Sequence, residues 1–357
     1  MPAMTEVIAC RGVQRMNVVI FTSPFDLAWQ TDVFGAVILT MFIVCAAYST
    51  VSWRRGRRIY GVLMISAGLY GVILETVAMM VLHIYHRGTF QIMINPAALP
   101  FVPESTPTLP LYVVIYYPTL LFIGYKVVEA LRVTRPLHAA ALGGLFMIAL
   151  DAPYTMQGHL EQLSWWSYNE SSRLVQFVGP WPMIDFCWLA TCHALFFAII
   201  TAARPAIDPR TVLGHTRWST TLAAVVFPTA TALLVLAGTS IILSPMAAAT
   251  LLGLPQWLVA AALMIALAVI SAGALRATTP CARPERVTAV LMGIYTVTFA
   301  VMIVYSVGTA AMSAGAIAAQ VVGLTLACLM TAYPAIAHRS SQHRRLRPGR
   351  DQQRQVM

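Results

Sequence analysis

The chain has 357 residues, of which 59% are hydrophobic and only 10% are charged, and its mean hydropathy is +0.73. A soluble globular protein carries about 25% charged residues, so this composition excludes that class. The net charge of +10 could indicate a nucleic-acid-binding protein, but the positive charges follow the loops of a membrane protein. We therefore expect a polytopic membrane protein with membrane lipids, and no nucleic acid, as partners.

The N-terminal 30 residues contain one short apolar piece, MNVVIFTSPF. This piece is too short to cross a bilayer and lacks the cleavage pattern of a signal peptide. We expect residues 1–30 to form an interfacial segment that includes a short helix on the membrane surface.

Apolar runs of about 20 residues fill most of the remaining chain, and runs of this length are typical of membrane-spanning helices. They cover residues 33–52, 59–82, 109–131, 136–156, 181–202, 219–243, 255–276, 286–306 and 312–334. The sequence therefore predicts an all-α, polytopic bundle of nine transmembrane helices.

Positive charges are distributed very unevenly between the two sets of loops. Of the 23 lysine and arginine residues, Arg11, Arg15, Arg87 and Arg173 fall on one predicted side. The other 19 fall on the opposite side, in segments such as RRGRR after the first run and the tail of residues 337–357. By the positive-inside rule, the N-terminus is outside and the basic tail is cytoplasmic, in contact with anionic lipid. We expect a multi-pass protein of a bacterial cytoplasmic membrane.

Ionisable residues divide the chain into two unequal parts. The runs within residues 204–336 are rich in small residues, which permit close helix packing and favour a scaffold. The runs within residues 31–203 contain several charged residues, and a charge inside a bilayer is expensive enough to mark a functional candidate. The two parts show no internal repeat, which weighs against an inverted-repeat transporter.

Most of these charges fall in the predicted outer half of the membrane. Glu75 and His83 lie on one face of the second run, and Asp185 and His193 lie on one face of the fifth. Glu129 lies at the opposite end, where a local ion pair with Lys126 or Arg132 is expected.

The stretch LDAPYTMQGHLEQLSWWSYN begins at the end of the fourth run and brings together ionisable residues, a proline and two adjacent tryptophans. Pro153 removes the hydrogen bond to the carbonyl of Ala149, so we expect a broken helix end that opens a polar pocket beside Asp151. The aromatic residues that follow form either an interfacial belt or the wall of a ligand channel. These residues are Trp165, Trp166, Tyr168 and Trp181.

A carboxyl group at this depth is favoured in its neutral form, as a general acid for protonating an alkene requires. Nearby aromatic rings could stabilise the resulting carbocation. The candidate catalytic residues are Asp151, Glu75, Asp185, His83 and His159, with the histidines in proton relay or water positioning. The candidate substrate-binding residues are Tyr154, Trp165, Trp166, Tyr168, Trp181 and His193. Such a reaction needs no cofactor, and we expect no metal; the structural alternative is a set of carboxyl groups hydrogen-bonded between helices.

Residues 70–200 resemble the membrane carotenoid hydratases, which carry a similar Asp-Pro, a W-x-W and a G-[IV]-P-x-x-N-[FY]-x-G-W segment. They also resemble multi-pass membrane proteins with the pattern D-x-PYD-x-x-G…WWTW…VPW. The matching residues are Asp151, Pro153, Tyr154, Gly158, Trp165, Trp166, Pro180, Trp181 and Pro182. Three residues depart from these patterns: Tyr168 stands where a tryptophan or histidine is usual, Thr155 where the second Asp would be, and Asp185 where the hydratases have Asn.

The leading hypothesis is a membrane enzyme of isoprenoid or carotenoid-type lipid metabolism that hydrates or cyclises a polyene by acid catalysis. Its substrate would be a lipophilic small molecule. One alternative is a proton-coupled transporter or lipid-binding protein, for which a polar path to the cytoplasmic side would be needed. Another is a metal-dependent lipid enzyme, in which the HxxH of His83 and His86 forms a metal site with His159 and His193.

Overall fold

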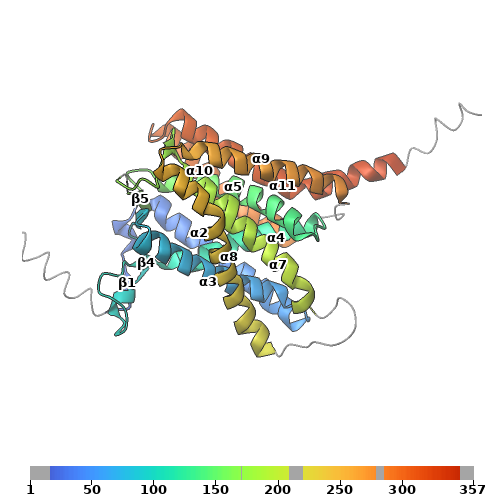
Figure 1. Cartoon of the computed structure of the whole chain (residues 1–357), viewed down its shortest axis with the longest axis horizontal. Helices are drawn as coiled ribbons and strands as arrows, with labels where there is room; N and C mark the ends of the chain where they lie inside the picture. The colour runs from blue at the N-terminus through green and yellow to red at the C-terminus, as the bar shows by residue number, and fades with distance from the viewer. Residues whose placement is uncertain (1–16, 170, 209–219, 279–284, 346–357) are drawn as a thin grey trace, which may run out of the picture.

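The computed structural model describes residues 17–169, 171–208, 220–278 and 285–345 (Figure 1). Within these residues, nine helical spans are long and apolar enough to cross a membrane, as predicted. The spans are α2 (Trp29–Arg54), α3 (Ile59–Thr76) with the π-helical turn η2 (Val77–Val81), α4 (Leu111–Ala130), α5 (Pro136–Gly158), the composite of α6 (Met183–Trp188), η4 (Leu189–His193) and α7 (Ala194–Ile207), α8 (Thr220–Leu251), α9 (Gln256–Ala277), α10 (Arg286–Gly308) and α11 (Ala314–Arg345). The chain is an all-α, multi-pass membrane protein.

The few strands gather at one end of the helices, where Figure 1 labels β1, β4 and β5. β1 (Val19–Phe21) pairs with β3 (Ile92–Ile94), which pairs with β4 (Leu109–Pro110); β2 (Tyr85–Arg87) pairs with β5 (Trp166–Tyr168); and β6 (Phe177–Val178) pairs with β7 (Trp181–Pro182). We call this end the strand end, and the end that carries the α2–α3 turn (residues 55–58) the basic end. Which end faces the cytoplasm stays a prediction from the loop charges.

The N-terminal segment differs from the expected surface helix. Its described part contains the strand β1 and a 3₁₀ turn, η1 (Pro24–Asp26). Val19, Ile20 and Phe21 are antiparallel to Ile92–Ile94 of the loop between α3 and α4. Because β-branched and aromatic residues pack well on a pleated surface, this piece is more stable as a strand on a neighbouring loop than as an isolated short helix.

The helices predicted to carry the ionisable residues occupy the centre of the bundle. Of the most apolar 18-residue stretch of each helix, 83% is buried in α4 and 89% in α5, whereas only 22% is buried in α9. α5 packs against α11, α7 and α9. The central position of α4 and α5 keeps their polar side chains away from lipid, where an unpaired polar group would be costly.

Pro153 does not break α5, which continues to Gly158. The carbonyl oxygen of Ala149 lies close to Gly323 of α11. A Cβ added to Gly323 would be only 2.6 Å from this oxygen. The hydroxyl of Tyr295 donates to the next carbonyl, that of Leu150, at 2.6 Å. The expected broken helix end is therefore wrong, because neighbouring helices accommodate the backbone that the proline disturbs.

Candidate functional site

A cavity of about 60 Å³ lies at the strand end, between α3, α4, α5 and the α6–η4 segment. We call it the strand-end cavity. Its ionisable or hydroxyl-bearing lining residues are Glu75, Tyr85, Arg87, Tyr116, Tyr117, Asp151, Tyr154, Thr155, Tyr168, Asp185 and His193. Since one water needs roughly 10–15 Å³ by this measure, the cavity has room for a few waters or for the end of a longer molecule.

The pairing of β2 with β5 places four side chains on one wall of the cavity. Tyr85 lies opposite Tyr168, and Arg87 lies opposite Trp166. Alternate residues of a strand point to opposite faces, so these four share one face while His86, on the other face, is exposed. All four line the strand-end cavity.

Arg87 and Glu75 form a buried, bidentate ion pair. Nη2 of Arg87 lies 2.5 Å from Oε1 of Glu75, and Nε lies 2.9 Å from Oε2. The two side chains are 7% and 0% exposed. Burial by itself lowers the pKa of Arg87, but the Glu75 carboxylate and nearby phenol groups raise it well above its ordinary value. The guanidinium therefore stays charged, and Glu75 neutralises it.

The remaining donors around this pair fix it in place. The hydroxyls of Tyr85 and Tyr117 donate to Glu75 at 2.8 and 2.7 Å. Nη1 of Arg87 donates to the hydroxyls of Tyr112 and Tyr154 at 2.7 and 3.1 Å. Glu75 thus accepts four hydrogen bonds, which suits an electrostatic and positioning role better than the proton transfer predicted for it.

Asp151 occupies a different environment within the same cavity. Its carboxyl oxygens accept hydrogen bonds from the hydroxyls of Tyr116 at 2.7 Å and Thr155 at 2.8 Å. Across the described residues, no lysine or arginine forms an ion pair with Asp151. A buried carboxyl with hydroxyl partners and no countercharge can hold a proton, so Asp151 remains a candidate acid.

Asp185 supplies a second such carboxyl from the first turn of α6. It lies beside Tyr168, whose phenol pKa is raised well above its ordinary value, first by burial and then by the Asp185 carboxylate. Asp185 and Asp151 therefore face one cavity from successive spans, each beside a phenol hydroxyl.

The π-helical turns η2 and η4 flank this site. η4 widens the helix between Asp185 and His193 and leaves both side chains on the cavity. The His193 ring stacks on Tyr117, with centroids 5.9 Å apart, and its Nδ1 has no hydrogen-bond partner within the described part of the chain. π-turns inside α-helices are frequent at functional sites, and an unpaired buried imidazole nitrogen is available for a ligand or a water.

Aromatic rings close the cavity beside the carboxyl groups. Trp166 lies 4.7 Å from the Tyr154 ring and stacks under the Arg87 guanidinium at 4.9 Å. Gly158 permits this position, because a Cβ there would collide with the Trp166 ring. Tyr154, Trp166, Tyr168 and His193, all predicted to bind substrate, do line the cavity.

His159 lies behind this wall and does not line the cavity. Its ring stacks on Tyr168 at 4.5 Å, and its Nε2 accepts a hydrogen bond from Nε1 of Trp166 at 3.3 Å. Burial, with a smaller contribution from Arg87, lowers the pKa of His159 to about 4. The imidazole is therefore neutral near pH 7 and holds the two aromatic rings in place.

The structure places three other predicted residues away from the cavity. His83 is exposed in a turn with φ 47°, because α3 and its π-turn end at Val81 and the helical spacing does not extend to it. Trp165 is fully buried, and its Nε1 donates to Thr31 at 2.8 Å. Trp181 packs on Phe186 with centroids 4.3 Å apart.

The sequence pattern did not identify Arg87, Tyr116 or Tyr117 as site residues. Tyrosines within an apolar span give no distinct signal. Arg87 did give one: it is among the few positive charges on the side where the positive-inside rule disfavours them. A basic residue in such a loop is a candidate for a buried ion pair.

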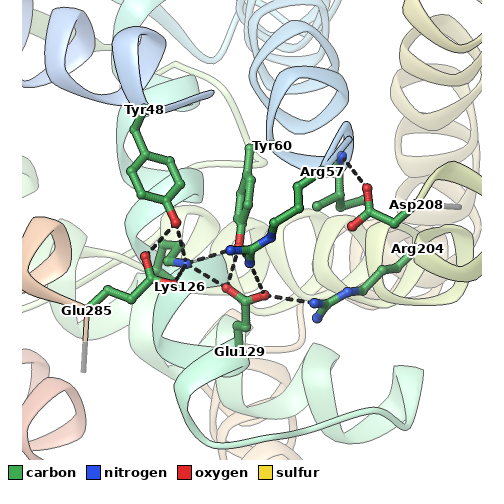
Figure 2. A network of polar contacts seen from close by, with 9 residues as sticks. Tyr48, Arg57, Tyr60, Lys126, Glu129, Arg204, Asp208 and Glu285 are labelled. Carbon is green, nitrogen blue, oxygen red and sulfur yellow. Dashed lines mark hydrogen bonds and ion pairs between the residues drawn. The ribbon is translucent and has the colours of Figure 1, made fainter. Parts of the chain in front are cut away.

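A second polar cluster lies at the basic end (Figure 2), and we call it the basic-end network. The predicted ion pair of Glu129 with Lys126 is confirmed at 2.6 Å. Arg204 and Arg57 join it at 2.8 and 3.1 Å, and Tyr60 donates to Glu129 at 2.6 Å. Lys126 also pairs with Glu285 at 2.7 Å.

An apolar layer separates the strand-end cavity from the basic-end network. Phe122 lies on α4 between Tyr117 and Lys126, and Phe196 and Phe197 lie on α7 between His193 and Arg204. All three phenylalanines are fully buried. Within the described residues, the same levels of these helices also contain buried hydroxyl groups, such as those of Thr119 and Thr201, but no charged side chain.

No family model, curated protein or solved structure matches the chain. In the described parts of the chain, no three His, Cys, Asp or Glu residues are grouped so that they could hold a metal ion. The four histidines predicted for a metal site are scattered: His83 and His86 are exposed, His159 is behind Trp166, and His193 faces the cavity.

Proposed function

We propose that the chain is an integral membrane enzyme of isoprenoid-type lipid metabolism. Its reaction is the acid-initiated hydration or cyclisation of a polyene double bond in the strand-end cavity. The observation that carries the proposal is the pair of carboxyl groups, Asp151 and Asp185, that face one aromatic-walled cavity and form no ion pair among the described residues.

In the hydration reaction, Asp151 transfers its proton to one carbon of the double bond, and the π electrons form the new C–H bond. The adjacent carbon becomes a carbocation, which the rings of Tyr154 and Trp166 can stabilise. Water attacks this carbon, and Asp185 accepts the proton released from the water. The cation of Arg87 does not oppose the charge that develops, because Glu75 neutralises it.

The size of the cavity limits which part of the substrate reacts. A volume of about 60 Å³ cannot enclose a long polyene, but it can admit the end of one. The reacting bond would then be a terminal one, with the rest of the chain in the lipid. The resemblance of residues 70–200 to carotenoid hydratases favours the same substrate class.

Three alternatives were open, and two of them receive less support. Proton-coupled transport needs a path for protons between the two ends, and the described residues place no charged or ionisable carboxyl, amine or imidazole group between the strand-end cavity and the basic-end network. Metal-dependent chemistry needs a set of ligands that the described residues do not bring together. A lipid-binding protein without catalysis would need neither carboxyl group, so substitution of these groups separates that alternative from an enzyme.

The test uses the full chain in cells that accumulate the acyclic polyene lycopene. We expect a product that is either a hydrate, heavier by one water, or a cyclised isomer; in heavy water it should contain one deuterium on carbon per reaction. Asp151→Asn should lower product formation by about 10²-fold or more, because general acid catalysis contributes about 10²–10⁴-fold.

Glu161→Gln, at an exposed position of the same end, is the matched control and should leave product formation unchanged. Unchanged turnover in Asp151→Asn at equal protein abundance would overturn the role of Asp151. Failure of the wild type to convert any acyclic polyene, tested with substrates of different lengths, would overturn the proposed function.

A further inference from the structure

An apolar groove runs along the bundle between α2, α3, the start of α4 and Ala224 of α8. Its volume is about 710 Å³, which is within the range of small-molecule pockets. We call it the side groove. On α3 it extends from Gly61 to Ile73, roughly 18 Å at 1.5 Å per residue. This length slightly exceeds half of the ~30 Å hydrocarbon core, so the groove serves one leaflet.

Gly68 forms the floor of the side groove. A Cβ at this position would still be 3.6 Å from its nearest neighbours, Pro118 and the backbone of Val114. An alanine would therefore fit here, whereas a larger side chain would occupy part of the groove that Gly68, Val114 and Pro118 line. The walls are apolar over most of their length, as an acyl chain requires.

The basic end of the side groove is polar, and one of its groups lacks a partner. Ser49 lines the groove and is only 4% exposed, yet its hydroxyl makes no hydrogen bond within the described residues. The adjacent Thr50 hydroxyl, by contrast, donates to the Ala46 carbonyl at 2.8 Å. A buried hydroxyl without a partner is costly, which indicates that a ligand supplies an acceptor.

Arg54 lies at the same end of the groove, less than two helical turns from Ser49. Among the described residues, no acid pairs with Arg54. The arginines of the basic-end network differ, since Arg57 and Arg204 both pair with Glu129. Arg54 is therefore available for an anionic group at the membrane surface.

We propose that the side groove binds one diacylglycerophospholipid with an anionic head group. One acyl chain lies along α3 over Gly68, an ester carbonyl accepts the hydrogen bond of Ser49, and the phosphate pairs with Arg54. The two polar contacts and the apolar channel occur in the order in which a phospholipid presents a phosphate, an ester and an acyl chain.

This occupant is distinct from the substrate proposed for the strand-end cavity. Tyr117 stands between the two sites: its hydroxyl binds Glu75 in the cavity, and its ring packs against Gly71 of α3. The side groove therefore binds a lipid that supports α2 and α3, and the proposal does not depend on the reaction.

The test measures lipids retained by the full chain after delipidation in detergent, using native mass spectrometry. Phosphatidylglycerol and phosphatidylcholine with identical acyl chains are then added back. The wild type should retain one phospholipid and prefer phosphatidylglycerol. Gly68→Leu should abolish retention by filling the groove. The matched control is Gly293→Leu, at a helical glycine with open space around it, and it should retain the lipid.

Polar variants test the head group and keep the proposal falsifiable if Gly68→Leu does not fold. Arg54→Gln should reduce the preference for phosphatidylglycerol about fivefold, as expected for one charge at an anionic surface, whereas Arg55→Gln, outside the groove, should not. Ser49→Ala should weaken binding a few-fold for both lipids. Equal binding of the two lipids by the wild type, or full retention in Gly68→Leu, would overturn the proposal.

Discussion

The strand-end cavity and the basic-end network are both buried ionic clusters, but they balance charge differently. At the basic end, Glu129 meets three cations, and Lys126 meets two carboxylates (Figure 2). At the strand end, Glu75 meets Arg87, while the partners of Asp151 among the described residues are hydroxyl groups.

The difference indicates what each cluster does. The attraction between paired charges offsets much of the cost of their desolvation. Such pairs hold helices in register, which is a structural role. A buried carboxylate with hydroxyl partners alone is stabilised less than one in an ion pair. Its protonation state can change without breaking an ion pair. The comparison therefore favours helix anchoring at the basic end, and it agrees with the proposed proton transfer at the strand end.

The largest effect is expected at the buried ion pair of the strand end. Glu75→Gln leaves the Arg87 guanidinium, 7% exposed, without its countercharge. Breaking a buried pair by removing one partner costs about 3–5 kcal/mol. We expect a loss of that size in the free energy of unfolding, measured by denaturant titration in mixed micelles.

The control for this prediction removes both charges. The double variant Glu75→Gln with Arg87→Met should recover part of the lost stability, because no unpaired charge remains buried. If Glu75→Gln alone costs no more than the exposed control Glu161→Gln, the ion pair does not anchor the site, and the contrast between the two ends fails.

A smaller effect is expected at the basic end. Glu129→Gln removes a partner from Arg57 and Arg204, but these side chains are 32% and 37% exposed and can be hydrated. Lys126 keeps Glu285. We expect a loss of about 2–3 kcal/mol, in the range of hydrogen bonds to charged groups. Product formation per folded molecule should not change, and a large fall would place Glu129 in the reaction.

The fold was predictable because each span carries its own signal. A run of about 20 apolar residues predicts a transmembrane helix without reference to the rest of the chain, and all nine predicted spans are present in the described residues. Only the ends shifted: the first span extends from the predicted 33–52 to Trp29–Arg54, since a helix continues through the interface beyond its apolar core.

The site was less predictable, because it depends on contacts between distant segments. Asp151 and Asp185 were found as charges within apolar runs. Arg87 was missed, because its position depends on the pairing of Tyr85–Arg87 with Trp166–Tyr168, and register between distant strands is weakly encoded. His83 was wrongly placed on the face of Glu75, because helical spacing was extended past Val81, where the helix ends.

The aromatic wall of the cavity can be tested through its backbone support. A Cβ in Gly158→Ala would collide with the Trp166 ring. Overpacking of this kind costs about 1–3 kcal/mol, and we expect about 2 kcal/mol, with a matching fall in product formation. Gly293→Ala has open space and should stabilise the helix by up to about 1 kcal/mol. Equal effects of the two substitutions would show that Trp166 does not need its present position.

The smallest effect concerns pH and sharpens the role of His159. Because the pKa of His159 is about 4 in the folded chain and about 6.5 in an unfolded one, only the unfolded chain binds a proton between these values. Stability should therefore fall as the pH decreases through this window, by about 1–2 kcal/mol at pH 5.

This fall can be isolated with His159→Gln, which has no titrating group at that position. The difference between pH 7 and pH 5 in the free energy of unfolding should be smaller in His159→Gln than in the wild type by that amount. An unchanged difference would mean that His159 is as easily protonated in the folded chain as in the unfolded one. The proton relay first predicted for His159 would then regain support, since a relay near neutral pH needs a group that can accept a proton there.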